Sequence, residues 1–227
     1  MSGTSTTTRI QHLVQAAFAL LLLRPFLKLF IGLRVYGREH LPERDPFILV
    51  ANHSSHLDTA ALLNLFPVSR LRRIRPCAAA DYFERTPTIA FLSHTLFNVL
   101  PIRRHDVQPE DHPIRRMREA LERGESLLLF PEGTRGRGPG MAPFKPGIAY
   151  LAEQLPHVPI VPAYLVNMGR ALPKGEFLPV PFFCEVRIGA PLRLSGTREE
   201  ILDAVRAAVD ALSDRAARTR AEPGAGR

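Results

Sequence analysis

His53 and Asp58 are the two residues whose types and spacing best suit proton transfer. They lie in a short polar segment that follows the apolar run Phe47–Ala51. On one continuous helix their side chains would point about 140° apart, given roughly 3.6 residues per turn. They meet only if His53 lies in a turn and Asp58 in the first helical turn, an arrangement that Ser54 and Ser55 favour as helix caps. The carboxylate would then orient the imidazole, whose other nitrogen would act as a general base.

Two other interpretations of this segment stay open. Ser55 to Asp58 also fits a capping box, in which the carboxylate does no more than hold backbone N–H groups at a helix start. His53, His56 and Asp58 are metal-ligand types, but no Cys or second acidic cluster completes a coordination shell. We therefore expect no metal site.

Basic and glycine-rich residues follow a second apolar run, Ser126–Phe130. The motif Phe-Pro-Glu-Gly-Thr-Arg at 130–135 leads into glycines and then into Phe-Lys-Pro-Gly at 144–147. A strand that opens into such a loop is where α/β sheets bind ligands, and Arg135 and Lys145 can hold a phosphate. The loop is not a Walker motif, because the Gly-Lys-Ser/Thr ending is absent. A flexible basic surface loop is the alternative.

The charge balance predicts an anionic partner. Lys and Arg number 30 against 22 Asp and Glu, a formal charge of +8. Arg103 and Arg104 could clamp an anion, although a solvated basic pair is the alternative. The absence of Trp and of a basic stripe on one helix face disfavours nucleic acid. Cys77 and Cys184 lie far apart, so a disulfide scaffold is excluded and a reducing compartment is expected.

The elements that must position these residues alternate between strands and helices. Short apolar runs predict the strands, and helical spacing with caps predicts the helices. A hydrophobic content of 45% is enough for a packed core, which excludes wholesale disorder. We therefore predict an α/β domain with a mostly parallel central sheet flanked by helices. The predicted strands are Phe47–Ala51, Ile74–Ala79, Val99–Ile102, Ser126–Phe130, Val158–Val166 and Phe182–Ile188. The predicted helices are His56–Phe66, Thr86–Thr95, Pro113–Arg123, Lys145–Gln154 and a last helix capped by Thr197, with Ile201, Val205, Val209 and Leu212 on one stripe.

The N-terminal segment 9–33 is apolar but interrupted by charge. Its uninterrupted apolar run is roughly eight residues, short of the ~20 that span a bilayer. Arg24, Lys28 and Arg34 beside clustered apolar residues predict an interfacial helix, kinked at Pro25, that docks on a membrane. A buried core helix and a signal or spanning helix are the alternatives. Residues 1–8 and 218–227 are predicted to be disordered.

Taken in order, these motifs resemble the four blocks of the glycerolipid acyltransferases of the lysophosphatidic acid acyltransferase type. The family's His-x4-Asp block is similar to residues 52–58, and its second block, apolar and ending in Arg, to 98–104. Its third block is similar to 130–135 with the following 144–147, and its fourth, an apolar strand containing proline, to 158–163. The resemblance covers roughly Leu33 to Ala190.

Two departures from the family pattern concern the acceptor side. Residues 101–103 are Pro-Ile-Arg where many members have Phe-Ile-Asp, and 136–140 are Gly-Arg-Gly-Pro-Gly rather than Ser-Arg-Asp-Gly. The Glu-Gly-Thr-Arg form of the third block is more similar to lysophosphatidate enzymes than to glycerol-3-phosphate enzymes, which often have Gly-Gly-Arg there. Another lysolipid or an amino-lipid therefore stays open as the acceptor.

The resemblance implies a glycerol-phosphate acyltransferase-like domain over 34–217. It would move a fatty acyl group from acyl-CoA or acyl-carrier protein to a lysophospholipid hydroxyl, above all that of 1-acylglycerol-3-phosphate, to give phosphatidic acid. His53 would be the base and Asp58 would orient it. Asn52 would help to hold the oxyanion, with the backbone amides of the helix start as the alternative. No cofactor is implied, because a thioester already has a good leaving group, and no Gly-x-Ser-x-Gly elbow is present. The implied acceptor-binding residues are Arg104, Arg135 and Lys145 for the phosphate, Glu132 for glycerol oxygens or for orienting Arg135, and Gly133 and Thr134 for the wall of the site.

The expected partners follow from the same resemblance. They are the acceptor lipid, the thioester donor, acyl-carrier protein where it is that donor, and a membrane surface, with the protein peripheral or monotopic on the cytoplasmic face. The basic charge favours anionic lipid. Nucleic acid is not expected. A metal-dependent hydrolase and a non-catalytic lipid-binding module are more distant alternatives, and the presence of both His53 and Asp58 disfavours the second.

Overall fold

The computed structural model describes residues 3–44, 46–80, 86–103, 112–136, 140–176 and 178–221 of the chain. Within these ranges, seven strands form one sheet in the order β1-β7-β6-β2-β5-β3-β4. Only the β6–β7 pair is antiparallel among the described pairs, so the predicted α/β fold with a mostly parallel sheet is confirmed. The strands are β1 (Arg34–Tyr36), β2 (Ile48–Ala51), β3 (Ile74–Ala79), β4 (Leu100–Ile102), β5 (Ser126–Leu129), β6 (Ile160–Val166) and β7 (Glu185–Ile188).

The central strands form where the sequence is continuously apolar. Leu49 of β2, Leu128 of β5 and Val161 of β6 are fully buried. Helices cover both faces of the sheet, so successive side chains of these strands all meet core rather than alternating with water. Val50 lies opposite Leu129 in the parallel β2–β5 pair. The two polar motifs that follow these strands therefore emerge at the same edge of the sheet.

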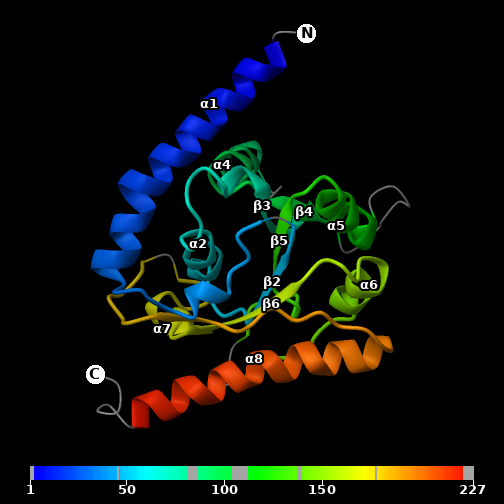
Figure 1. Cartoon of the computed structure of the whole chain (residues 1–227). Helices are drawn as coiled ribbons and strands as arrows, with labels where there is room; N and C mark the ends of the chain where they lie inside the picture. Colours follow the sequence, from blue (N-terminus) through cyan, green and yellow to red (C-terminus); the bar gives the residue numbers. More distant parts are fainter. Residues whose placement is uncertain are drawn as a thin grey trace.

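Two helical layers enclose the sheet (Figure 1). The N-terminal helix, α2, α4 and α7 lie over one face, and α5, α6 and α8 over the other. The predicted apolar stripe of α8 packs into the second layer, and Thr197 and Glu200 form a capping box at its start. The remaining helices are α2 (Leu57–Leu63), α4 (Pro87–Phe97), α5 (Pro113–Glu122), α6 (Gly147–Gln154), α7 (Met168–Ala171) and α8 (Arg198–Ala221), with short 3-10 turns at Arg38–His40 and Leu71–Arg73.

The N-terminal helix is continuous from Gly3 to Phe30. It consists of α1 (Gly3–Phe18) and two π-helical stretches, Ala19–Leu23 and Phe26–Phe30, on either side of Pro25. Proline lacks the N–H that an α-helix needs, and a local change of register lets the helix pass it. The helix thus includes residues 3–8, which the sequence predicts to be disordered, just as α8 extends beyond 217 to Ala221.

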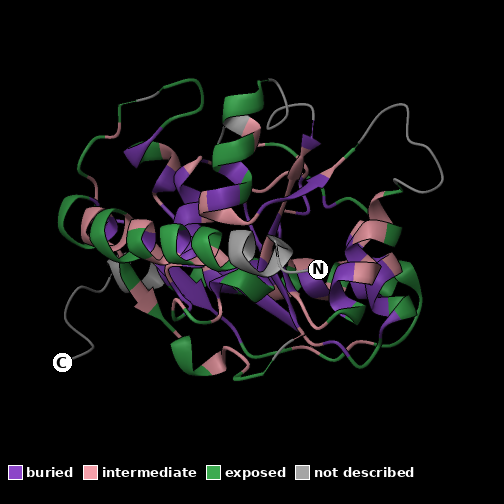
Figure 2. Cartoon of the chain, turned by 90° about the horizontal axis from the view of Figure 1, so that it is seen from above, coloured by how far each residue is buried: buried purple, intermediate pink, exposed green. Residues whose placement is uncertain are grey.

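This helix is also longer than the apolar run predicts. By length and composition alone, Arg9–Phe30 is one helix of the described residues that could cross a membrane. Arg24 and Lys28 interrupt the apolar run without ending the helix, which is why counting the run underestimates its length. Leu27 and Ile31 are buried in the core, whereas the outer side of the helix is largely exposed, as Figure 2 shows in green. The core-helix interpretation therefore holds for one face only.

Candidate active site

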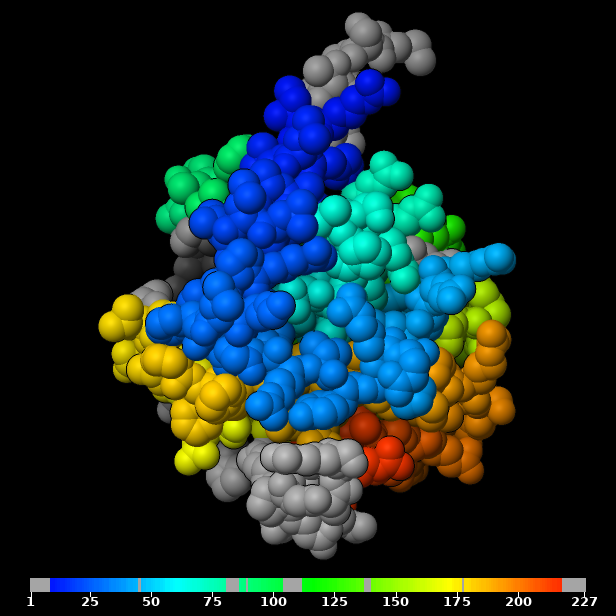
Figure 3. All heavy atoms as spheres, turned by 60° about the vertical axis from the view of Figure 1, so that its left-hand side comes forward, coloured from blue at the N-terminus to red at the C-terminus, as the bar shows by residue number. Residues whose placement is uncertain are grey.

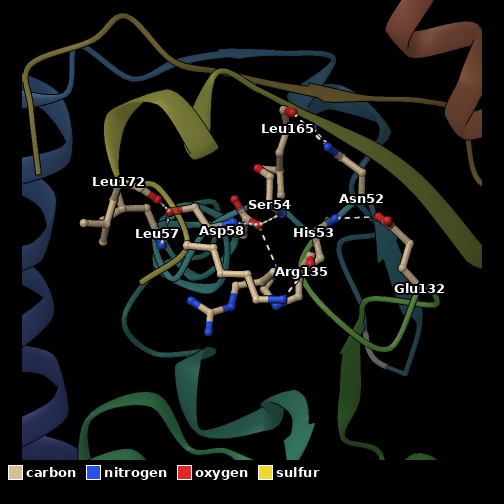
Figure 4. Close-up of polar contacts among 11 residues, drawn as sticks. Asn52, His53, Ser54, Leu57, Asp58, Glu132, Arg135, Leu165 and Leu172 are labelled. Carbon is tan, nitrogen blue, oxygen red and sulfur yellow. Dashed lines mark hydrogen bonds and ion pairs between the residues drawn. The ribbon is translucent and has the colours of Figure 1, made fainter. Parts of the chain in front are cut away.

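His53 and Asp58 meet as their spacing predicts (Figure 4). Nδ1 of His53 lies 2.8 Å from Oδ2 of Asp58, with His53 in the turn after β2 and Asp58 in the first turn of α2. The same buried oxygen accepts the backbone N–H groups of Ser54 and Ser55 at 2.6 and 2.8 Å. The capping-box and general-base interpretations therefore describe one carboxylate, which shapes the turn and also orients the imidazole.

Phe130 fixes the plane of the His53 ring. The two rings stack with their centroids 4.1 Å apart and their planes 16° from parallel. An ionised carboxylate accepts only, so the contact with Asp58 requires the imidazole proton on Nδ1. Nε2 is then the nitrogen that can take a proton from a substrate. The side chain of His53 is 20% exposed.

Glu132 holds the same turn from the side of the third motif. Its side chain is buried, Oε1 accepts the N–H of His53 at 2.8 Å, and Oε2 accepts the N–H of Ala142 at 2.9 Å. The N–H of Gly136 in turn donates to the carbonyl of His53 at 2.9 Å. Glu132 thus uses both oxygens to join two backbone loops, and its hydrogen bonds do not include the guanidinium of Arg135.

Asn52 and Ser55 tie the turn to the other side of the sheet. The side-chain oxygen of Asn52 accepts the N–H of Leu165 at 2.7 Å, and its nitrogen donates to the carbonyl of Leu165 at 3.0 Å. These bonds extend the pairing of β2 with β6. Ser55 Oγ donates to the carbonyl of Leu172 at 2.8 Å. Asn52 therefore has a structural role in the sheet, and its expected contact with an oxyanion stays a prediction.

A cavity of about 350 Å³ opens beside the His53 ring. Polar, cationic and apolar side chains all line it, a combination that suits an amphiphilic molecule. The polar lining residues include His53, His56, Thr134, Arg135 and Lys174. The apolar ones include Pro76, Cys77, Ala78 and Ala79 of β3, with Phe97, Val99 and Phe130.

His56 and Cys77 carry no charge in this cavity at neutral pH. Burial, followed by the positive fields of Arg135 and His53, lowers the pKa of His56 to about 4, although Asp58 acts in the opposite direction. Burial raises the pKa of the Cys77 thiol to about 12. The thiol therefore stays protonated and cannot serve as a nucleophile at pH 7.

Residues of the third motif, 130–135, lie at the cavity, as expected for a ligand-binding loop at the end of a strand. Gly133, Thr134 and Arg135 line it. Gly133 has φ +72°, and a Cβ there would lie 2.6 Å from Cε of Lys145, so the loop requires glycine. Lys145 is exposed and packs over Gly133 rather than lining the described part of the cavity. Arg104 lies outside the described residues.

Lys174 is a cavity residue that the sequence does not predict. It lies in the connection after α7, and its ammonium group donates to the carbonyl of Arg135 at 3.2 Å. Its Pro-Lys-Gly surroundings at 173–175 resemble an ordinary surface turn, so no motif marks it. Among the described residues, no group of three His, Cys, Asp or Glu side chains is placed to hold a metal ion.

Comparison with known proteins identifies the family of the chain. The Acyltransferase family model matches residues 32–166, a range that contains both polar motifs. The chain is 30% identical over 174 residues to a chloroplastic 1-acyl-sn-glycerol-3-phosphate acyltransferase of Brassica napus, covering 74% of this chain and 46% of that protein. It is 31% identical over 201 residues to a 1-acyl-sn-glycerol-3-phosphate acyltransferase of Chlamydomonas reinhardtii, covering 88% of this chain and 57% of that one. The chain therefore spans about half the length of these curated relatives.

A solved structure shares the fold. The crystal structure of the 1-acyl-sn-glycerophosphate acyltransferase PlsC from Thermotoga maritima superposes with a TM-score of 0.73. The match covers 96% of this chain and 84% of that one at 22% sequence identity. At this identity the likeness extends to the arrangement of helices and strands.

Proposed function

Because this chain belongs to the Acyltransferase family, we propose that it is a 1-acylglycerol-3-phosphate O-acyltransferase that produces phosphatidic acid. The observation that carries the proposal is the contact of His53 with Asp58, 2.8 Å apart, where His53 lines a cavity that has both cationic and apolar side chains. The names of the relatives support the choice of acceptor.

In the proposed reaction His53 is the general base. Its Nε2 takes the proton of the acceptor hydroxyl as the hydroxyl oxygen attacks the carbonyl carbon of the thioester. A C–O bond forms and the C–S bond breaks, and the proton passes to the departing thiolate. Asp58 stabilises the positive imidazolium between these events. The protonated thiol of Cys77 agrees with direct transfer that needs no protein nucleophile.

The acceptor's phosphate is assigned to the cationic side chains of the cavity. Arg135 is one of them, and a guanidinium suits a phosphate because it donates two parallel hydrogen bonds. Arg104 and Lys145 complete the proposed phosphate site, and Gly133 and Thr134 shape its wall. Glu132 contributes by holding the His53 turn in place, since both of its oxygens bind backbone.

The donor and the location belong to the same proposal. Acyl-CoA or acyl-carrier protein supplies the acyl group, and no cofactor takes part. The exposed face of the N-terminal helix docks the protein, as a peripheral or monotopic enzyme, on the cytoplasmic face of a membrane, where acceptor and product reside. The face is apolar and carries Lys28, a combination that suits an anionic lipid surface.

One assay tests the proposal. The purified protein is given a panel of lysolipids and an amino-lipid, each with acyl-CoA and with acyl-carrier protein, and the products are read by mass spectrometry. Phosphatidic acid from 1-acylglycerol-3-phosphate is expected as the main product, and His53→Ala, folded as shown by circular dichroism, should form none. Faster transfer to another acceptor would replace the assigned substrate, and near-normal turnover by His53→Ala would overturn the mechanism.

A further inference from the structure

The connection between α7 and β7 exposes apolar side chains in residues 178–183. Leu178 is 80% exposed and Phe183 is 72% exposed, and Val180 is about half exposed. Isolated exposed apolar residues are common on protein surfaces, but three within six residues form an apolar patch, which is typical of an interaction surface.

This loop lies against the end of the N-terminal helix. A Cβ at Gly32 would lie 2.7 Å from Cδ1 of Phe183, so the aromatic ring occupies the space that glycine leaves. Leu29 and Phe30, in the last turn of the helix, are exposed as well. Figure 3 shows the end of the helix, in blue, beside the connection between α7 and β7, in gold. Through Phe183 the loop therefore adjoins the end of the helix, and both segments present exposed apolar side chains.

In the backbone of the loop, prolines and hydrogen bonds lower the number of unbonded N–H and C=O groups, which suits an environment with little water. Pro179 and Pro181 have no N–H, and the N–H of Val180 donates to the carbonyl of Ala171 at 2.8 Å. The carbonyl of Phe183 accepts the side-chain amide of Asn167 at 3.0 Å. Unbonded backbone groups are costly in an apolar medium, and these features keep their number low. The same bonds hold the exposed side chains outward.

Guanidinium groups lie beside the aromatic rings of this loop. The guanidinium of Arg34 lies 5.8 Å from the ring of Phe183, and that of Arg170 lies 5.0 Å from the ring of Phe182. Lys28 precedes the exposed end of the helix, and Lys174 precedes the loop. Basic side chains around exposed apolar groups match an anionic lipid surface, in which the chains enter and the cations stay among the headgroups.

We propose that residues 178–183 are a second membrane-docking element, which enters the interface of an anionic bilayer beside Leu29 and Phe30. A bilayer is favoured over a protein partner because the loop adjoins the exposed apolar end of the N-terminal helix and is bordered by cations. The inference rests on the proposed function, which places the acceptor in the membrane. Lys174 lines the cavity and belongs to the same connection, so docking brings the cavity close to the headgroups.

The absence of Trp from the chain permits a direct test. Leu178→Trp places one fluorophore in the loop. The loop leads into β7, whose Glu185 pairs with Val166 at the end of β6, so the loop lies near that end. His157 is exposed and precedes the start of β6, at its other end. His157→Trp therefore places a fluorophore far along the sheet from the loop. Both variants are mixed with vesicles of phosphatidylglycerol and phosphatidylcholine, with and without bromine on the acyl chains. The emission of Leu178→Trp should shift to shorter wavelength and be quenched by the brominated lipid, and that of His157→Trp should not.

A second measurement uses the same pair of sites without a fluorophore. Leu178→Ser should weaken vesicle binding about tenfold, because a leucine is removed from the apolar phase, and His157→Ser should leave binding unchanged. The proposal fails if the Leu178→Trp spectrum is unaltered by vesicles that sediment the protein. It also fails if the spectrum shifts with protein concentration alone, which would indicate a second copy of the chain. Neither readout depends on turnover, so failure of the acyltransferase assay would refute the proposed function separately.

Discussion

Replacing Asp58 with asparagine separates the charge of this carboxylate from its hydrogen-bond geometry. Oδ2 accepts His53 Nδ1 and two backbone N–H groups, whereas Oδ1 is buried and has no hydrogen-bond partner among the described residues. An asparagine can therefore place its oxygen at the position of Oδ2 and its nitrogen at the position of Oδ1 without displacing a donor. The turn should keep its shape while the negative charge is lost.

The expected loss of activity follows from Coulomb's law. When His53 takes the acceptor's proton, the imidazolium and the Asp58 carboxylate have charge centres ~4 Å apart, which is worth about 4 kcal/mol at an effective dielectric constant of about 20. A barrier raised by this amount slows kcat about 10³-fold. The backbone bonds become neutral rather than charge-assisted, so unfolding should become easier by only about 1–2 kcal/mol. Asp58→Ala, which leaves two backbone N–H groups without an acceptor, should be less stable than Asp58→Asn.

The assay measures kcat at saturating donor and acceptor together with thermal unfolding by circular dichroism. Asp210→Asn is the matched control, because Asp210 is exposed on α8 and lies 3.6 Å from Arg206, and it should match the parent protein in both measurements. If Asp58→Asn is folded and retains kcat within tenfold of the parent, stabilisation of an imidazolium by Asp58 is not part of the mechanism.

Three other variants and one treatment probe the rest of the site. Glu132→Gln replaces one acceptor oxygen with an amide donor that faces a backbone N–H. We expect the free energy of unfolding to fall by about 2 kcal/mol and kcat to fall with little change in acceptor KM. Thermal unfolding and steady-state kinetics measure these effects, and a rise in KM alone would indicate substrate contact instead. Arg135→Ala should raise the acceptor KM most among the cavity variants, and an unchanged KM would remove it from the phosphate site. His56 binds a proton below about pH 6.5 when unfolded but only near pH 4 when folded. The melting temperature should therefore fall as pH drops through that window, less steeply in His56→Gln, and parallel curves would contradict the assignment. Dialysis against EDTA should leave transfer activity intact, and a loss that added metal restores would favour a metal-dependent reaction.

The sequence predicts elements well where burial is uniform. β2 and β5, which are buried at every position, each differ from the prediction by one terminal residue. Strands enclosed on both faces consist of continuous apolar runs that pattern reading detects. β1 was not predicted, because its three residues, Arg34–Tyr36, are exposed or partly exposed at the sheet edge and form no apolar run. β1 forms because it pairs with β7, a contact between segments that are far apart in the sequence.

The same contrast applies to the active site. The contact of His53 with Asp58 was predictable, because both residues lie within one turn and the cap chemistry there is local. The bond of Glu132 to the N–H of His53 depends on the parallel pairing of β2 with β5. Lys174 reaches the cavity from a connection more than a hundred residues after His53 in the chain. Neither long-range contact leaves a periodic or spacing signal in the sequence.

The N-terminal helix packs against the core with one face and exposes the other face. Leu27 and Ile31 are buried, and Arg24 donates to the carbonyl of Phe66 at 2.7 Å. The helix is therefore part of the folded domain, and removing residues 1–33 would open the core as well as delete any membrane contact. Loss of vesicle binding after such a deletion would not identify a docking face. Substitution of exposed positions such as Leu29 alters the outer face alone, because the packing that fixes the helix comes from its inner face.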